Sequence, residues 1–183
     1  MTAQAPDTIR RDTNYRMIRA YYGVRLYKDD VQGVCDSLIY YSKDSTMVMH
    51  GSPVCWNDDS QMSADQMTIY MKNDEVDHFY GIGNAISVQQ ESPERFDQLA
   101  GKELYGYMTD GELRQIYVKG NAQTIVFPKD DDDRFVGMNK TESSYVRLFI
   151  KDSKIDYVVF TSTTSGTLYP LDGLSDSQTH LSS

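Results

Sequence analysis

A seven-residue motif recurs four times along the chain and constrains its fold more than any other feature. Each copy has an aromatic residue, a short polar cluster and then an apolar residue, and the copies occupy residues 41–47, 70–76, 107–113 and 149–155. Pairs such as Asn73-Asp74 in the second copy accept the positive φ angles of tight reversing turns. The motif therefore predicts a series of β-hairpins, and the unequal intervals between copies predict connections of different length.

The residues beside each expected turn alternate between apolar and polar side chains. Met67, Ile69 and Met71 alternate before the second turn, and Leu148 and Ile150 do so before the fourth. A period of two indicates strands with one buried face. A further hairpin is expected ahead of the first motif, and no segment has the 3.6-residue period of a helix. The sequence therefore predicts an all-β protein.

A glycine step recurs after the returning strands, as Gly51-Ser52-Pro53, Gly83-Asn84-Ala85 and Gly120-Asn121-Ala122. Glycine inside a strand pattern marks a bulge or corner. A repeated unit of strand, turn, strand and corner predicts an antiparallel sandwich, roll or jellyroll. We expect one domain over residues 12–171, with residues 1–11 disordered or foreign to the native protein and residues 172–183 forming a polar tail or linker.

The charge balance excludes one class of partner. The chain has 18 Lys and Arg against 27 Asp and Glu, a net charge of −9. A non-specific nucleic-acid binder needs a basic stripe to displace counterions, and the sequence has none, so we expect no nucleic-acid partner. No run approaches the ~20 apolar residues of a membrane-spanning helix.

Catalytic and metal-binding motifs are missing from the sequence. It contains no GxSxG elbow, HExxH pair or Walker loop, so we expect no enzyme, no cofactor and no metal. A thiol site joining Cys35 to His50 or His78, and a pair of glycosidase-like carboxylates, are weaker alternatives. Cys35 and Cys55 would either pair in an oxidising compartment or remain buried free thiols.

A methionine-rich stripe lies on the expected inward face. It would be either ordinary core or a soft apolar groove, because thioether side chains adapt to flexible ligands such as acyl chains. Ile39, Tyr41 and Phe79 place apolar groups on the outward face, so that face is packed or the register is shifted by one residue. The residues expected to line a slit are Val24, Leu26, Leu38, Met47, Met49, Met67, Ile69, Met71, Leu104, Met108, Leu148 and Ile150.

Six segments follow one another in a distinctive order: Tyr21–Tyr40, Gly51–Trp56, Phe96–Lys102, Val118–Ala122, Gly137–Asn139 and Leu168–Pro170. Together they resemble the OstA-like family, relatives of the periplasmic lipopolysaccharide-transport protein LptA, in the version found in Bacteroidetes-type bacteria. The resemblance extends over about residues 8–171. Members of this kind are longer, so the resemblance implies that the chain is one domain of a larger protein.

The resemblance implies an open, slit-like β-jellyroll that holds the acyl chains of lipid A within a bridge of jellyrolls across the periplasm. It implies a non-enzymatic carrier of lipopolysaccharide whose signal peptide has been removed from this chain. Partners would be other jellyroll proteins joined by edge-strand pairing, and free edges also predict a head-to-tail homo-oligomer. The alternative is a structural module that pairs with other jellyrolls without binding lipid itself.

Overall fold

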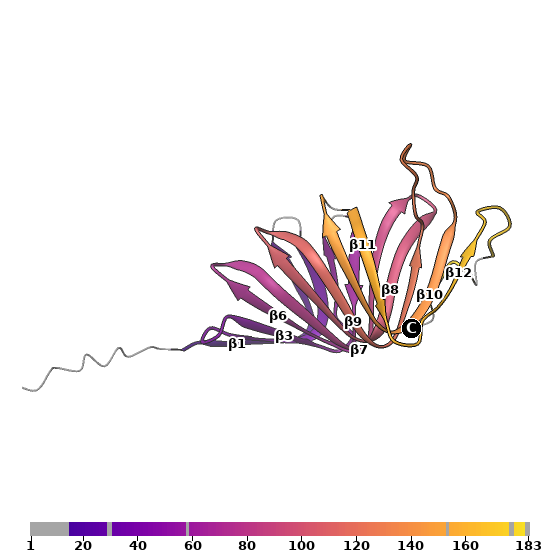
Figure 1. Cartoon of the computed structure of the whole chain (residues 1–183). Helices are drawn as coiled ribbons and strands as arrows, with labels where there is room; N and C mark the ends of the chain where they lie inside the picture. Colours follow the sequence, from indigo (N-terminus) through magenta and orange to yellow (C-terminus); the bar gives the residue numbers. More distant parts are fainter. Residues whose placement is uncertain (1–14, 29–30, 58, 153, 176–177, 182–183) are drawn as a thin grey trace, which may run out of the picture.

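The protein is a single antiparallel sheet folded on itself (Figure 1). The structure is a computed structural model and describes residues 15–28, 31–57, 59–152, 154–175 and 178–181. These residues form a 12-stranded sheet and no helix, which confirms the all-β prediction. The strands are β1 (Met17–Lys28), β2 (Val31–Tyr41), β3 (Thr46–His50), β4 (Val54–Asn57), β5 (Ser60–Ser63), β6 (Gln66–Lys72), β7 (Glu75–Ser92), β8 (Arg95–Thr109), β9 (Glu112–Val126), β10 (Met138–Lys151), β11 (Lys154–Thr161) and β12 (Ser165–Tyr169).

The long strands pass through two halves of the sheet, which we call wing A and wing B. In wing A, β2 pairs with β3, β7 with β6 and β10 with β11; in wing B, the same strands pair with β4, β5 and β12. Figure 1 shows the strands converging along one side and diverging from it as the two wings. The sheet is therefore V-shaped, with an inner face that both wings share.

Glycine steps form the corner where the wings meet. Gly51, Gly83 and Gly120 have φ angles of 76°, 75° and 77°, and the residue after each of them also has a positive φ. This left-handed region is open to glycine and strained for most other residues. The register of β7 against β8 shifts at the same level, between Ile82 and Ala85. The corners expected from the sequence are thus confirmed.

The hairpin turns also have the expected backbone. Asn73 and Asp74 have φ angles of 53° and 65°, and Asp110 and Asp152 have φ angles of 53° and 51°. Two successive positive φ angles match the right-handed twist of the flanking strands, which is why short polar residues occupy these positions. The turn between β1 and β2 falls at residues 29–30, outside the described residues.

The inner face of wing A consists of two rows of directly paired residues that run from β2 to β11. The row beside the corner is Leu38, Met49, Met67, Gly81, Leu104, Val118, Val146 and Phe160. The next row outward is Tyr40, Met47, Ile69, Phe79, Gly106, Ile116, Leu148 and Val158. Paired residues share a face, so each row is a continuous apolar stripe across the sheet.

Phe79 lies on the inner face, and its outward assignment from the sequence is wrong. The register of β6 against β7 shifts between Tyr70 and Met71, which places Phe79 opposite Ile69. An extra residue in a strand exchanges the two faces beyond it. Ile39 and Tyr41 do lie outward, opposite Val48 and Thr46.

The Gly106→Val variant should lower the free energy of unfolding by about 1–3 kcal/mol, the usual cost of overpacking a filled site. A Cβ on Gly106 would overlap the ring of Phe79, which covers that position. Val is otherwise favoured over Gly in strands, so a loss of stability in this variant would be caused by the clash with the Phe79 ring. In a double-mutant cycle, Phe79→Ala should rescue Gly106→Val by a measurable coupling energy. Equal or higher stability of Gly106→Val alone would show that the ring does not occupy this place.

A second apolar cluster lies on the outer face of wing B, around Ile125, Phe127 and Met138. The C-terminal residues cover it, because Leu174 packs against the cluster and Leu181 is buried in it. Gln98 fixes this segment: its Nε2 donates to the Thr179 carbonyl at 2.6 Å, and its Oε1 accepts from the Leu181 amide at 2.9 Å. The described part of the expected tail is therefore docked on the sheet, while the domain boundary at residue 171 stays a prediction.

Candidate functional site

Most of the residues expected to line a slit meet in one apolar cluster on the inner face. Five of them are buried there, and five more pack against the cluster while partly exposed; they are Leu38, Met49, Met67, Leu104 and Leu148, then Val24, Leu26, Met47, Ile69 and Ile150. The cluster takes side chains from both wings, including Cys35 and Ala85 of wing B. The structure thus brings these ten residues together on the inner face of the V.

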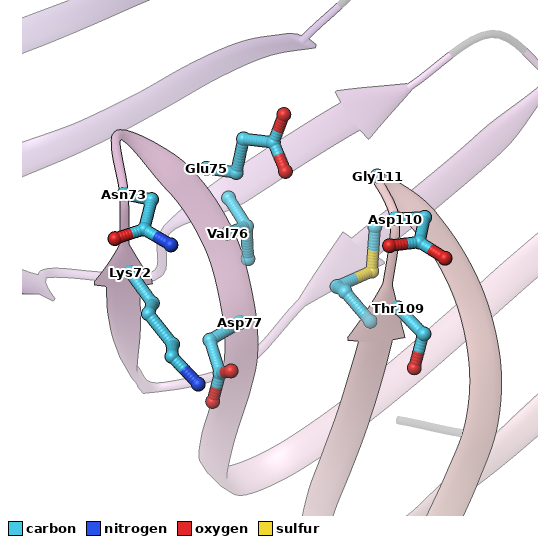
Figure 2. Close-up of a pocket in the computed structure, with 9 residues that line it drawn as sticks. Lys72, Asn73, Glu75, Val76, Asp77, Thr109, Asp110 and Gly111 are labelled. Atoms are coloured by element: carbon cyan, nitrogen blue, oxygen red, sulfur yellow. The ribbon is translucent and has the colours of Figure 1, made fainter.

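Met71 and Met108 lie apart from this cluster. Each follows a register shift near a hairpin tip, between Tyr70 and Met71 in β6 and between Tyr107 and Met108 in β8. Met108 instead lines a hollow of about 270 Å³ between the β6–β7 and β8–β9 turns, where most neighbours are polar. Figure 2 shows Asn73 and Glu75 on one side of this hollow and Asp110 and Gly111 on the other.

Sequence reasoning missed the inward residues of the returning strands. Ile116 and Val118 in β9, and Val158 and Phe160 in β11, belong to the two inner rows. The alternation that identified the outgoing strands continues through these segments and is the signal that finds them. The complete inner face is therefore wider than the predicted set.

The inner face is packed at the corner and more accessible toward the open side of the V. Leu104, Val118 and Val146 in the first row are fully buried. In the second row, Ile116 and Leu148 are buried, whereas Met47, Ile69 and Phe79 toward the β3–β6–β7 end are only half-buried. An apolar surface that opens outward in this way can accept a further apolar group without losing its packed base.

Polar contacts join the tips of the wings at both ends of the inner face. Lys28, at the wing B end of β1, donates from Nζ to the carbonyl oxygen of Asp74 in the β6–β7 turn at 2.7 Å. At the other end, Asp133 in the loop after β9 lies 3.8 Å from Lys154 Nζ at the start of β11. These side chains are exposed. An exposed ion pair contributes about 0–1 kcal/mol, so the second bridge opens at little cost.

A buried carboxyl anchors the loop that carries the second bridge. Oδ1 of Asp97 accepts the Phe127 amide at 2.8 Å, and the Asp97 residue is 7% exposed. Burial raises the pKa of Asp97 to about 6, and the hydrogen bond from Phe127 opposes this shift. Nearby, Lys129 pairs with Glu91 at 2.9 Å.

The thiol–imidazole site considered from the sequence is not assembled. Cys35 lies in the inner cluster, whereas His50 pairs with Ser37 and His78 with Tyr70 in outward rows. The ring of His78 stacks on Tyr70 with centroids 4.2 Å apart. Among the described residues, no three His, Cys, Asp or Glu side chains are grouped to hold a metal ion. No part of the chain that the structure describes forms a helix long and apolar enough to cross a membrane.

Both ends of the sheet present unpaired strand edges within the described residues. β1 pairs only with β2, and at the other end β11 and β12 pair only with β10. Apolar side chains are exposed along these strands, including Ile18 on β1, Tyr157 on β11 and Leu168 on β12. Unpaired backbone N–H and C=O groups beside apolar side chains are suited to pairing with another strand.

The repeated hairpins, glycine corners and shared apolar inner face define an open β-jellyroll, as the sequence predicted. A solved structure to which the chain is similar is LptH from Pseudomonas aeruginosa, described as the LptA homologous periplasmic component of the conserved lipopolysaccharide transport device. The two share 13% sequence identity with a TM-score of 0.58, over 76% of this chain and 95% of the LptH chain. At this identity the likeness establishes the shared fold. No protein-family model and no curated protein matches the sequence.

Proposed function

We propose that the chain is a non-enzymatic periplasmic module that binds the acyl chains of lipopolysaccharide and passes the lipid along an envelope bridge. The observation that carries this proposal is the pair of apolar rows that line the inner face from β2 to β11 in a fold shared with LptH. Half-buried Met47 and Ile69 would meet the ligand first. Lipid A is the expected ligand class, and no cofactor is required.

Burial of acyl chains would drive binding, because the charge of the protein gives no long-range attraction to an anionic lipid. The net charge is −9, so phosphate groups of the ligand would be repelled at a distance. Each methylene transferred from water to an apolar site contributes about 0.8 kcal/mol. The affinity should therefore depend more strongly on acyl-chain length than on salt.

The free edges support assembly with other jellyrolls. β1 at one end and β11 with β12 at the other end would each accept a strand from a neighbouring domain. Different edges at the two ends favour a head-to-tail arrangement, with another jellyroll of the bridge or with a second copy of this chain. Such stacking would make the inner faces continuous from one domain to the next.

Site-specific photo-crosslinking tests lipid binding with two adjacent positions that face opposite sides. A photoreactive residue at Ile69, on the inner face, should label lipopolysaccharide, and one at Tyr70, on the outer face, should not. Both side chains are partly exposed, so accessibility is matched. Equal labelling from both positions, or labelling from Tyr70 alone, would contradict binding on the inner face.

The second candidate function is an assembly module that binds no lipid. The burial of most of the first row favours it, since packed side chains such as Leu104, Val118 and Val146 leave little space at the base of the inner face. The same crosslinking experiment separates the two functions. Edge-to-edge protein crosslinks from β1 or β12 without any lipid adduct from Ile69 would identify an assembly module.

A further inference from the structure

A cluster of sulfur atoms lies at the base of the inner face, where the two wings meet. The Cys55 Sγ is 3.6 Å from the Met67 Sδ and 4.0 Å from the Met49 Sδ. Met49 is 0% exposed and Met67 is 2% exposed. The three residues come from β4, β3 and β6, so the cluster exists only when the sheet is folded.

The topology of the sheet explains why these atoms converge. Met49 and Met67 are direct partners across β3 and β6 in wing A, and Cys55 reaches them from β4 in wing B. Gly33, the partner of Cys55 on β2, leaves room for them. A Cβ at Gly33 would lie 3.3 Å from the Cys55 Sγ and 3.5 Å from the Met49 Cε. The absence of a side chain at Gly33 thus lets the Cys55 thiol and the end of Met49 pack close to the β2 backbone.

We propose that Cys55, Met49 and Met67 form a binding site for a soft monovalent metal ion, Cu(I). Thiolate and thioether sulfurs are the ligands that select Cu(I) over harder cations. Metal–sulfur bonds of about 2.3 Å in a trigonal plane place the sulfur atoms about 4.0 Å from one another. The separations of the Cys55 Sγ from the two methionine sulfurs, 3.6 and 4.0 Å, are close to that edge length.

Charge favours a monovalent ion in this place. A lone thiolate is unfavourable among these apolar side chains. Cu⁺ replaces the thiol proton, which is released to solvent, and the thiolate and the ion form a neutral pair. A divalent ion such as Zn²⁺ would leave a net positive charge among apolar side chains, which is costly.

The site is independent of lipid binding, because its atoms lie beneath the half-buried row that would meet a ligand. It also differs from a disulfide, since Cys35 and Cys55 are both free thiols in the structure. Met49 and Met67 were expected from the sequence to line a slit, and here they have a second role. Nothing in the alternation of the strands brings Cys55 to them.

Competition for Cu(I) tests the proposal. The reduced full chain, titrated without oxygen against a colorimetric Cu(I) chelator, should withhold one Cu(I) per molecule. Cys55→Ser should abolish this retention, and Met67→Leu, which conserves volume, should weaken the affinity at least tenfold. Because one proton is displaced, the affinity should also fall about tenfold for each unit decrease in pH near neutrality.

The matched control is Met138→Leu, which removes an equally buried thioether from the second cluster and should leave Cu(I) retention unchanged. Thermal melting of each variant checks that it remains folded. Unchanged retention in Cys55→Ser or in folded Met67→Leu would place the copper elsewhere and overturn the proposal. No retention by the folded wild type, or retention of Zn²⁺ in preference to Cu(I), would overturn it equally.

Discussion

Leu104→Ala should lower the free energy of unfolding by about 2–5 kcal/mol, the range for large-to-small substitutions in packed cores. Leu104 is 0% exposed and lies in the first inner row between Gly81 and Val118. Gly81 has no side chain to move into the space left by the truncation, and the Met62 methyl group covers this glycine. Urea denaturation followed by circular dichroism measures the change, provided that the m-value is unaltered.

Leu168→Ala is the control for this substitution. Leu168 lies on β12 and is 59% exposed, so the same change there should shift stability by less than about 0.5 kcal/mol. A loss below about 1 kcal/mol for Leu104→Ala would mean that its side chain lines an unfilled space in the ligand-free protein. The experiment therefore measures how completely the base of the inner face packs before any ligand binds.

The turns and corners of this fold were predictable from the sequence because their causes are local. Asn73-Asp74 and Gly83-Asn84 need positive φ angles, and few residue types accept them. Repetition of these pairs then locates the strands between them, and alternation gives their inner face. This local information was sufficient to predict an all-β sandwich, roll or jellyroll and ten of the residues on its inner face, and the family resemblance selected the jellyroll.

What the sequence could not predict depends on bulges and on contacts between the wings. One extra residue in β7 places Phe79 inward, and no residue type in that segment identifies the bulge. The contact of Lys28 with Asp74 and that of Cys55 with Met67 join segments that only the folding of the sheet brings together. Such contacts follow from the angle between the wings, which alternation alone does not determine.

The composition of the C-terminal segment did not predict that the segment docks on the sheet. Its Ser, Asp and Thr residues are typical of a linker, yet Leu174 and Leu181 are sufficient to dock it on the second cluster. The polar partner that fixes it, Gln98, lies far away in the sequence on β8. Two leucines and the hydrogen bonds of Gln98 thus dock a segment whose composition is mostly polar.

Asp97 should make the protein more stable in mild acid than at neutral pH. Burial raises its pKa from 3.8 to about 6 in the folded state. Above that value the carboxyl is ionised in both states, and burial of its charge opposes folding. As the pH falls through 6 toward 3.8, the folded protein takes up a proton that the unfolded chain does not yet bind, so the free energy of unfolding rises. The full gain from this group is about 3 kcal/mol.

The Asp97→Asn variant isolates this effect, because the amide keeps an oxygen that can accept the Phe127 amide hydrogen. It should be more stable than the wild type at pH 7 by up to about 3 kcal/mol, and the difference should vanish near pH 4. Subtracting the two stability profiles removes the contribution of other carboxyls, such as Glu103, whose pKa is lowered chiefly by its hydrogen bond with Tyr105.

Asp156→Asn, at an exposed position on β11, is the matched control and should change stability by less than about 0.5 kcal/mol. A wild type that is the more stable of the pair at pH 7 would show that the Phe127 amide and Lys129 fully compensate the buried charge. In that case the carboxylate itself, rather than its protonated form, would hold the loop that bridges the two wings.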